Sequence, residues 1–600
     1  ADKVLDEVQV TAAGEAPATE GYQAFSSRSS TKTDTLLRDT PQSVSVVTSQ
    51  QIKDQAVQSM ADAVRYTPGV TFAQGEGNRD AAVIRGSIST GDFYLDGVRD
   101  DVQYYRDVYN IDRIEVLKGA NGLAFGRGGS GGVINRVSKE ANWSPIREVG
   151  VSVGSYGHKR ATLDLGQGLT ETVAARVNVV TEDSESYRQD VELRRTGVAP
   201  TLTLKPSERT KVVVSGEFFN DLRTADRGVP SQNGKPFRTD SKTFFGNADQ
   251  SPTETTVNTV AVAVEHRLQN GILVSNKTRL ADYDKYYQNV FASSAVSNAG
   301  LVALSAYVDD TQRENVFNQT DVVFKFATGP LRHQMVTGVE VGRQDTENYR
   351  INGAVAPSPV PASNPRGNVT FAATRARDSE SRIDVASAYV QDQIELGSQW
   401  QTVLGLRHDR FETDLTDRVV AANSGKVVDS EVSPRAALIF KPADNVSLYA
   451  SYSQTFVPRA GDQLISLTGS NRNFDPEEFI NKEVGAKWDV RPDLSLTAAV
   501  YRLERNNVAV PDPVDPMQTI LVDGQLVRGV ELGVSGKVTE AWSVTGGYSH
   551  ADSEIKRSQS AAIQAGNETA QTPRHTFSLW NRYDFSEKYG AALGVVSRSA

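Results

Sequence analysis

The stretch Val446-Ser-Leu-Tyr-Ala-Ser-Tyr-Ser-Gln-Thr-Phe456 decides the fold class, because apolar and polar residues alternate along it over about ten positions. Leu494 to Arg502 repeats the pattern, and Val149 to Val153 shows a shorter version of it. Successive side chains of a strand point to opposite faces, so each run predicts a strand with one apolar face. A run of about ten residues exceeds the usual soluble strand and matches a tilted strand that crosses a bilayer.

The connections between these runs are of two kinds. Nine are short and rich in turn residues, and they lie near 169–172 and at 206–209, 269–271, 329–330, 397–399, 442–445, 491–493, 539–541 and 586–588. The others are mostly long and polar, for example 220–255, 283–316, 344–380 and 454–482. Short turns at one end and long loops at the other are typical of an outer-membrane barrel. A soluble propeller is the alternative, but its repeated motif of about 40–50 residues is not visible.

The turns also predict the number of strands. Nine short turns join eighteen strands, and Tyr589 to Val595 begins a nineteenth. Barrels of this kind have an even number of strands and close on themselves, and a wide barrel with a filled lumen has about 22. Residues 143–600 are therefore predicted to form a transmembrane β-barrel that lacks its last strands.

The first 142 residues have a different character. Residues 1–38 are polar and rich in Ser, Thr and Ala, which is typical of a mobile tail. Residues 39–142 look globular: Thr48 and Gln51 form a capping box for one helix that continues through Val64. Short strands are predicted at 43–47, 82–85, 93–95, 113–117 and 132–137. This mixed α/β domain precedes a barrel too wide to fill itself, so we expect it to be a plug inside the lumen.

The composition excludes several functions. The chain has 64 basic and 74 acidic residues and a net charge of −10, which offers no general surface for nucleic acid. It has no cysteine and six scattered histidines, so we expect no metal site and no bound cofactor. No catalytic constellation is visible in the sequence, so we do not expect an enzyme. Gly126 to Gly131 matches a dinucleotide fingerprint, but the β-like Val133 to Val137 follows where a helix is needed. Those glycines instead predict tight turns against the barrel wall.

Several plug motifs carry a family resemblance. They are Asp39-Thr-Pro-Gln-Ser-Val-Ser-Val-Val47, Val83-Ile-Arg-Gly86, Asp92-Phe-Tyr-Leu-Asp-Gly-Val-Arg99, Ile114-Glu-Val-Leu-Lys-Gly119 and Phe125-Gly-Arg-Gly-Gly-Ser-Gly-Gly-Val-Ile-Asn135. Together they resemble the plug of TonB-dependent outer-membrane ferric-siderophore receptors. The catecholate branch is the most similar, since a segment like Tyr104 to Asp107 precedes its Glu-Val-Leu-Lys-Gly strand. In the barrel the resemblance includes Ser433 to Arg435 and Thr572 to His575.

The resemblance implies a TonB-coupled importer in the outer membrane of a Gram-negative bacterium. It implies a TonB box formed by Asp6, Glu7, Val8, Gln9, Val10, Thr11 and Ala12, a β-prone segment that pairs with the edge of a partner's sheet. A box at residue 6 leaves no room for a signalling domain, so we expect a transporter, and Ala1 resembles a mature terminus after signal-peptide removal. The implied partners are a ferric siderophore, TonB with its inner-membrane energising complex, and outer-membrane lipid or lipopolysaccharide.

A ferric siderophore brings its own iron ligands, so the receptor needs cations and aromatic faces. The resemblance places two plug loops at the outer vestibule, and we predict ligand contacts by Arg79, Gln103, Tyr104, Tyr105 and Arg106. An aromatic cluster in the loop after the seventh strand is a further candidate and contains Tyr283, Tyr286, Tyr287 and Phe291. A catecholate is favoured. A hydroxamate, haem, cobalamin or a saccharide stays open, and haem would need an exposed axial histidine.

Other charged plug residues are predicted to anchor the plug to lumen carboxylates such as Glu395 or Glu483. They are Arg85, Glu115, Lys118, Arg127 and Arg136. A plug held by polar contacts can shift when it is pulled. We therefore expect external binding to move the plug, the tail to become available in the periplasm, and TonB to supply the force that opens a path.

Overall fold

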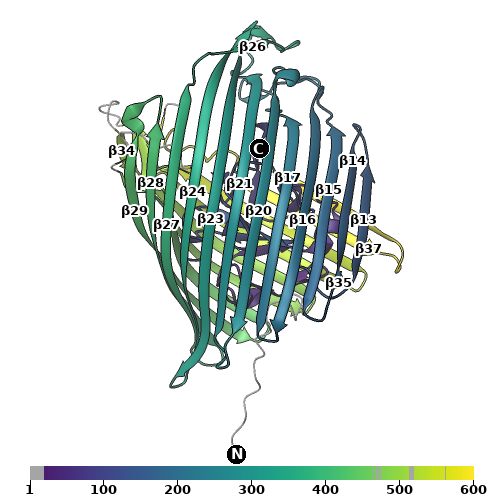
Figure 1. The fold of residues 1–600 in the computed structure, drawn as a ribbon, viewed down its shortest axis with the longest axis vertical. Coiled ribbons are helices and arrows are strands. Elements are labelled where there is room, and N and C mark those ends of the chain that lie inside the picture. Colours follow the sequence, from purple (N-terminus) through teal and green to yellow (C-terminus); the bar gives the residue numbers. More distant parts are fainter. Residues whose placement is uncertain are drawn as a thin grey trace, which may run out of the picture.

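The computed structural model describes residues 19–599 apart from 462, 464, 466, 468–471, 473, 512–518 and 561–562. One antiparallel sheet of twenty strands curls around a smaller domain (Figure 1). In order across the sheet, the strands are β13 (Ile146–Val153), β14 (Lys159–Gly168), β15 (Val173–Glu185), β16 (Glu192–Ser207), β17 (Thr210–Thr224), β20 (Pro252–Arg267), β21 (Leu273–Ala292), β23 (Leu304–Thr328), β24 (Leu331–Ala356), β26 (Asn368–Phe371), β27 (Arg377–Glu395), β28 (Trp400–Asp417), β29 (Gly425–Ala443), β30 (Val446–Val457), β31 (Glu477–Arg491), β32 (Leu494–Asn506), β35 (Gln525–Thr539), β36 (Trp542–Ile555), β37 (His575–Asp584) and β38 (Gly590–Arg598).

Buried and exposed residues alternate along the long strands, as the period of two predicts. In β27, Ser381 and Ile383 are buried while Arg382 between them is exposed. The side that faces the small domain carries many polar residues, and the outer side exposes apolar residues such as Val484 and Val500. None of the described helices is long and apolar enough to cross a membrane.

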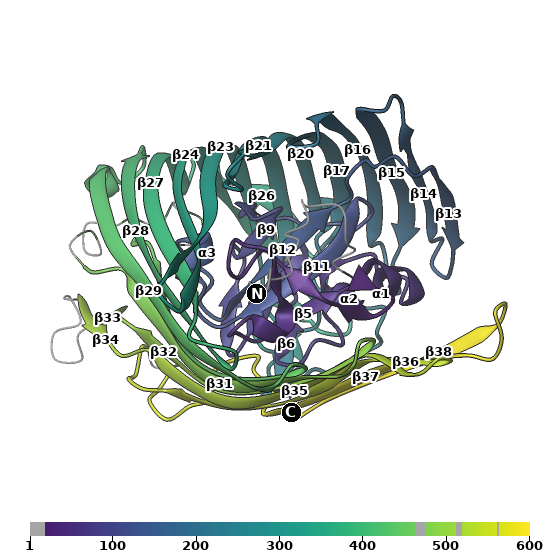
Figure 2. The same cartoon turned by 90° about the horizontal axis from the view of Figure 1, so that it is seen from below.

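All nine predicted short turns join neighbouring strands of this sheet. The Gly329-Pro330 turn, for example, connects β23 to β24. The sheet consists of the nineteen predicted strands and the short β26, which lies between β24 and β27 at the outer end (Figure 1). Seen from below, β13 and β38 form the two edges (Figure 2), and within the described residues each pairs with a single neighbour. A total of about 22 strands stays a prediction.

Two of the predicted long loops are largely strand, which corrects the sequence analysis. Strands β21, β23 and β24 continue through much of 283–316 and 344–380, and β24 is 26 residues long. At about 3.3 Å per residue this is far more than a bilayer crossing requires. The outer parts of these strands carry polar residues on both faces because both faces are wet there, and the pattern therefore resembles a loop.

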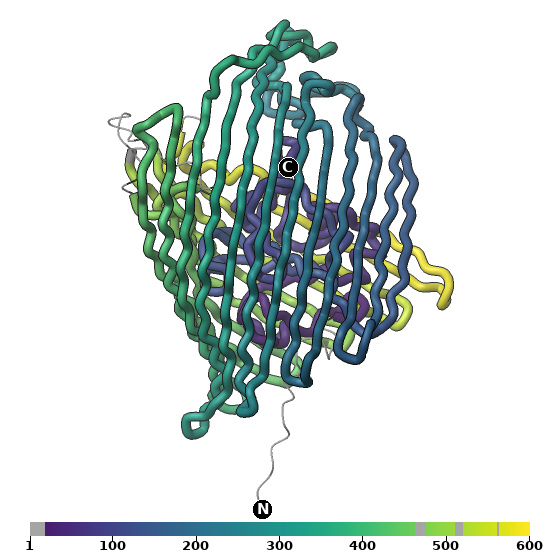
Figure 3. Tube along the Cα trace, in the orientation of Figure 1, coloured from purple at the N-terminus to yellow at the C-terminus, as the bar shows by residue number. Residues whose placement is uncertain are grey.

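The small domain is the predicted plug, and its chain runs inside the barrel (Figure 3). Its elements are β5 (Val44–Val47), α1 (Ser49–Asp54), α2 (Met60–Ala63), β6 (Val70–Phe72), η2 (Gly75–Gly77), β7 (Ala82–Ile84), β8 (Ser87–Ser89), β9 (Phe93–Leu95), β10 (Val98–Arg99), β11 (Ile111–Lys118), α3 (Gly122–Phe125) and β12 (Gly132–Ser138). A five-stranded sheet has the order β10-β9-β12-β11-β5, and β6, β7 and β8 form a second sheet.

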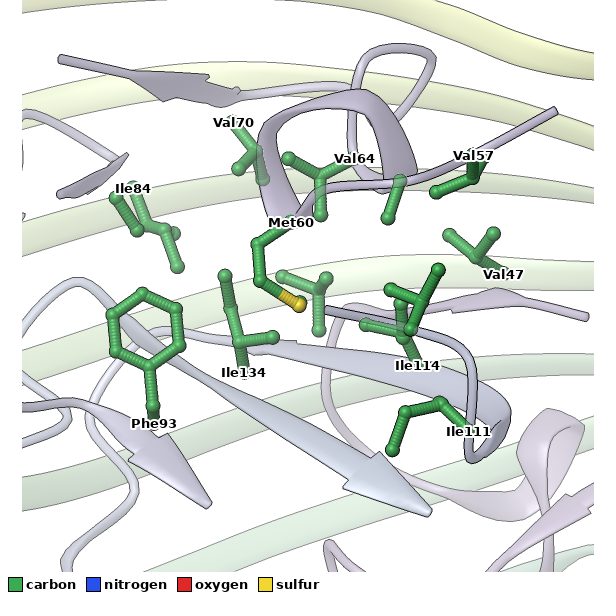
Figure 4. Close-up of a cluster of buried hydrophobic side chains, with 14 residues drawn as sticks. Val47, Val57, Met60, Val64, Val70, Ile84, Phe93, Ile111, Ile114 and Ile134 are labelled. Carbon is green, nitrogen blue, oxygen red and sulfur yellow. The ribbon is translucent and has the colours of Figure 1, made fainter. Parts of the chain in front are cut away.

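The predicted single helix of the plug is two short helices. The capping box of Thr48 and Gln51 is present, but α1 ends at Asp54. Ala56 has φ 49°, and Ser59 caps α2 with its side chain. A left-handed residue followed by a new cap interrupts the helix. Figure 4 shows how α2 packs into the plug core, which contains Val47, Val57, Met60, Ala63, Val64, Val70, Ala82, Ile84, Phe93, Val108, Ile111, Ile114, Val116 and Ile134.

The remaining elements are short and lie before the plug or in the loops. Before the plug are β1 (Thr19–Glu20), β2 (Gln23–Ala24), β3 (Ser26–Ser27), β4 (Thr35–Leu36) and η1 (Leu37–Asp39). In the loops are β18 (Ser231–Gln232), β19 (Lys235–Pro236), η3 (Ala248–Gln250), β22 (Leu301–Val302), β25 (Val360–Pro361), η4 (Ala421–Asn423), β33 (Val508–Pro511) and β34 (Thr519–Val522). Much of the segment from Ser27 to Thr35 is buried and bonds to the lumen wall, for example through Arg435 to the carbonyl of Ser30.

Candidate functional site

The outer half of the lumen wall carries a group of arginines and aromatic rings beside the apical loop of the plug. We call it the arginine wall and define it as Arg79, Arg227, Arg350, Arg377, Tyr287, Phe291 and Tyr307, with the carboxylates of Glu76 and Asp309. Arg79 and Glu76 belong to the plug; the aromatic rings, Arg350, Arg377 and Asp309 lie on β21, β23, β24 and β27, and Arg227 follows β17.

The plug loop fixes one side of the arginine wall. Glu76 pairs with Arg79 at 3.0 Å and with Arg227 at 3.3 Å. The Tyr307 hydroxyl donates to the Glu76 carboxylate at 2.8 Å, and the Tyr287 hydroxyl donates to the Glu76 carbonyl at 3.0 Å. Burial alone would raise the pKa of Glu76, but the two arginines outweigh it and hold the pKa at about 2. Glu76 is therefore ionised at neutral pH.

The barrel supplies the other side of the arginine wall. Arg350 lies 4.2 Å over the Tyr307 ring and pairs with Asp309 at 2.6 Å. Arg377 is 3.7 Å from the same carboxylate, and Arg227 lies 3.9 Å over the Phe291 ring. Four guanidinium groups thus share two carboxylates, and the arginine side chains are 18% to 35% exposed. The wall has an excess of positive charge, flat aromatic faces and access to solvent.

A cleft of about 380 Å³ lies on the other side of the plug. The turn between β7 and β8 forms its floor, where Ile88 is more than half exposed. Arg459 and Arg505 line it, paired with Asp429 at 2.5 Å and with Glu477 at 2.7 Å. The strands that carry this cleft and those that carry the arginine wall lie on opposite sides of the plug (Figure 2). The plug apex therefore separates a cationic wall from a charge-balanced cleft.

Three of the five predicted ligand residues, Arg79, Gln103 and Tyr105, keep part of their surface exposed, and their role in ligand contact stays a prediction. Arg79 is part of the arginine wall. Gln103 is half-buried and donates to the Thr90 hydroxyl at 2.9 Å. Tyr105 is half-buried, with its ring 4.0 Å from the Arg223 guanidinium and its hydroxyl bonded to the Gln74 carbonyl at 3.1 Å. These placements are compatible with ligand contact.

Arg106 is inside the plug, which corrects the prediction. It is 1% exposed and all five of its N–H donors are used. They bond to the Asp100 carboxylate at 3.0 Å, the Asp80 carboxylate at 3.5 Å, and the carbonyls of Tyr104, Asp100 and Val102 at 3.1, 2.6 and 2.8 Å. Its guanidinium thus closes the apical loop and has no donor left for a ligand.

Tyr104 is also buried, which corrects the prediction that it contacts the ligand. Its hydroxyl donates to Asp100 at 2.9 Å, and its ring packs against Phe219 and Tyr283 of the barrel. Burial raises the pKa of Tyr104 well above its ordinary value. The residue joins the plug to the wall and does not face the vestibule.

The predicted aromatic cluster is divided by the alternation of β21. Tyr283 and Tyr287 point into the lumen and are buried, and Phe291 lies in the arginine wall. Tyr286 lies on the opposite face of β21, and its hydroxyl donates to the Gln288 side chain on that face. The cluster was predicted in a loop, and because it lies in a strand its four rings cannot share one surface.

Three predicted anchors contact the barrel. Arg85 makes the predicted pair with Glu483 at 2.6 Å, and it also pairs with Glu531 at 3.0 Å. Lys118 lies 3.4 Å from Glu531. Arg127 pairs with Asp101 of the plug at 2.8 Å and bonds to Gln344 of the barrel.

Two predicted anchors stay within the plug and its N-terminal segment, and one predicted acceptor lies elsewhere. Glu115 bonds to Arg113 at 2.9 Å and to Ser29, because β11 turns it away from the wall. Arg136 pairs with Asp100 of the plug. Glu395 is exposed at the end of β27.

Sequence reasoning missed three acidic plug residues that hold barrel arginines. Asp107 pairs with Arg160 at 2.7 Å and Arg195 at 2.6 Å. Asp101 pairs with Arg313 at 3.2 Å, and the Asp100 carboxylate accepts from Tyr283 at 2.6 Å and lies 3.7 Å from Arg279. The adjacent acidic residues Asp100 and Asp101 are the sequence feature that could have indicated these contacts with the barrel.

The predicted TonB box, residues 6–12, lies outside the described residues. In the part of the chain that the structure describes, no group of three His, Cys, Asp or Glu side chains is placed to hold a metal ion. The predicted glycine turns follow the barrel closely: Gly126 has φ 71°, and a Cβ there would lie 2.8 Å from the Arg407 guanidinium. The strand β12 follows Gly131, so no helix is present for a dinucleotide.

Comparison with known proteins supports this architecture. The TonB-dependent receptor plug domain matches residues 36–133, and the TonB-dependent receptor-like β-barrel matches residues 199–599. The chain is 30% identical to the probable TonB-dependent siderophore receptor PiuA of Acinetobacter baumannii, over 93% of this chain and 82% of PiuA. It is 26% identical to the catecholate siderophore receptor Fiu of Escherichia coli K12, over 93% of this chain and 80% of Fiu. The crystal structure of PiuA superposes with a TM-score of 0.88 at 28% identity, covering 96% of this chain and 89% of that chain.

Proposed function

This chain belongs to the TonB-dependent receptors of the Gram-negative outer membrane, and from that premise we propose that it binds a ferric siderophore at the arginine wall and imports it with energy supplied by TonB. The preferred chelate is an anionic catecholate. The observation that carries the proposal is the excess of arginine over carboxylate beside flat aromatic rings at the plug apex.

The chemistry of the chelate matches that of the wall. A ferric tris-catecholate is a bulky anion whose iron is already fully coordinated, so a protein recognises it by charge and by ring contacts. Arg350 and Arg377 share one carboxylate, and Arg79 and Arg227 share another. Each pair keeps donors for an incoming anion. The similarity to PiuA, a probable siderophore receptor, and to Fiu, a catecholate siderophore receptor, supports the same ligand class.

Import requires that the plug moves. Buried ion pairs hold it at four places on the wall, through Arg85, Asp100, Asp101 and Asp107. Such pairs are strong in place and costly to break singly. We propose that TonB pairs with residues 6–12 and that its force, transmitted along the segment before the plug, breaks these contacts.

The binding proposal is tested with purified receptor and two chelates, a ferric tris-catecholate and an uncharged ferric tris-hydroxamate, by quenching of intrinsic fluorescence. Arg350→Ala and Arg377→Ala each remove one charged donor, worth about 1.5–3 kcal/mol, so we expect the tris-catecholate to bind at least about tenfold more weakly. Arg343→Ala is the matched control, because Arg343 lies on β24 with its side chain on the outer face, paired with Asp384.

Two results would count against the proposal. Equal affinity of the wild type and both lumen variants for the tris-catecholate would remove the arginine wall from the site. Equal binding of the charged and uncharged chelates would show that charge does not select the ligand.

A further inference from the structure

The outer face of β28–β36 contains a shallow apolar hollow of about 850 Å³. Its apolar side chains come from neighbouring strands in register: Leu438 opposes Ala450, Ala450 opposes Val484, and Val484 opposes Val500. Val484 and Val500 are 62% and 57% exposed. The small side chain of Ala450 leaves the hollow open at its centre. This surface faces the hydrocarbon of the membrane.

Three cations lie side by side at the upper rim of the hollow. Lys482 on β31 is directly opposite Arg502 on β32, and Arg502 is directly opposite Arg528 on β35. Like charges in directly opposed positions of a sheet repel one another. We call these three residues the cation row.

The acidic residues nearby do not balance this row. Glu504 lies 2.6 Å from Arg502 and 3.7 Å from Lys482, so one carboxylate serves two cations. Asp552 opposes Arg528 in the register. Within the part of the chain that the structure describes, Arg528 forms no ion pair. The row therefore has unmet capacity for anions.

In a second region of the outer face, each arginine forms an ion pair with a carboxylate. On β24, β27 and β28, Arg343 pairs with Asp384 at 2.7 Å and Arg382 pairs with Asp345 at 2.7 Å. Arg410 pairs with Glu412 at 2.9 Å. Arg343 and Arg382 each have their own carboxylate, whereas Glu412 pairs with both Arg410 and Lys426. The cation row differs from this region because its three cations directly oppose one another and Glu504 is paired with only two of them.

The position of the row along the strands places it at the outer boundary of the bilayer. Strand β31 runs down to its short turn after Arg491, and Lys482 precedes that end by nine residues. Arg502 follows the start of β32 at Leu494 by eight residues. At about 3.3 Å per residue these lengths are about 26–30 Å of tilted strand, close to what a bilayer crossing needs. Phosphate groups of outer-leaflet lipid lie at that level.

We propose that the hollow and the cation row form a docking site for a phosphorylated, acylated lipid of the outer leaflet. The phosphate accepts hydrogen bonds from Lys482, Arg502 and Arg528, and the acyl chains lie over Ala450 and Val484. The bound phosphate relieves the repulsion within the row. Because the site is on the outside of the barrel, its occupancy does not depend on which chelate the lumen binds.

The test measures binding of lipid A to purified receptor in detergent by native mass spectrometry, with bis-phosphorylated and dephosphorylated lipid A as the two probes. The triple variant K482Q/R502Q/R528Q removes the row, and the matched control R343Q/R382Q/R410Q removes three paired arginines from the same face. We expect the row variant to bind bis-phosphorylated lipid A at least about tenfold more weakly, and the control to bind within about twofold of the wild type. A second variant, Ala450→Phe, fills the hollow and should also weaken binding.

Several outcomes would overturn the proposal. These are equal loss in the row variant and the control, equal binding of phosphorylated and dephosphorylated lipid A, or full competition by inorganic phosphate without the lipid. Chelate binding, measured on the same preparations, should be unchanged in all three variants. Failure here therefore remains distinct from failure of the arginine wall.

Discussion

Arg85 of the plug and its two barrel partners, Glu483 and Glu531, form a buried contact that we call the latch. Breaking the latch should make local opening of the plug more frequent by an amount that the structure allows us to estimate. The Arg85 side chain is fully buried, pairs with Glu483 and Glu531, and lies 3.9 Å over the Tyr501 ring. The change Arg85→Met keeps most of the side-chain volume and removes the charge. It leaves two buried carboxylates, of which Glu531 keeps its ion pair with Lys118 and Glu483 loses its ion-pair partner.

Removing one partner of a buried ion pair costs about 3–5 kcal/mol, because the other partner stays charged and unsolvated. A tenfold change in an equilibrium corresponds to about 1.4 kcal/mol. We therefore expect the local opening of the plug around β7 to become about 100- to 4,000-fold more frequent. Hydrogen exchange of the β7 amides, read in the regime where exchange follows the opening equilibrium, measures this directly.

A control and a rescue make the test specific. Arg65→Met breaks the exposed pair of Arg65 with Asp62 and should cost at most about 1 kcal/mol. The double variant R85M/E483Q removes the uncompensated charge and leaves Glu531 to Lys118, so it should recover more than half of the lost protection. If Arg85→Met exchanges no faster than Arg65→Met, the reasoning about the buried latch is wrong.

Three further predictions concern the plug and are read by hydrogen exchange of plug amides. The pKa of Asp101 is held at about 2, below its ordinary 3.8, because Arg313 and Arg127 outweigh its burial. A carboxyl whose folded pKa is depressed stabilises the plug above its unfolded pKa, so Asp101 should contribute about 2 kcal/mol above pH 4 and lose it between about pH 4 and 2. The change Asp101→Asn should remove this share of the acid dependence, while the share of other depressed carboxyls such as Glu76 remains. Gly126→Ala should destabilise the plug by about 1–2 kcal/mol through its positive φ, with further loss from the contact with Arg407, whereas a neutral result would disprove the close approach. Thr48→Ala should cost about 1 kcal/mol, confined to amides near α1, and a uniform loss across the plug would contradict a local cap.

Local patterns determined most of what the sequence predicted correctly. The short turns are marked by residues such as Gly329 and Pro330 within the turn itself, so no distant contact is needed to place them. The alternation of the strands reports their two environments directly. The partnership of Arg85 with Glu483 was predictable for a different reason, since a buried plug arginine must meet a lumen carboxylate.

Distant contacts decided what the sequence predicted wrongly. Tyr104 and Arg106 look like surface residues of an apical loop, but Phe219, Tyr283 and Asp100 bury them. No spacing in the sequence reports those partners. Arg350 and Arg377 were not predicted as site residues because the wet upper parts of β24 and β27 resemble loops. Their role depends on a shared carboxylate, Asp309, that is brought close only by strand register.

Uptake of radioactive iron into cells tests the central claim most directly. A strain that lacks its own catecholate receptors would express either the full chain or a variant without residues 7–11, and would receive ferric tris-catecholate labelled in the iron. We expect both proteins to bind the chelate at the cell surface and only the full chain to import it, because binding uses the arginine wall and import needs TonB. Import at the full rate by the variant would contradict the account.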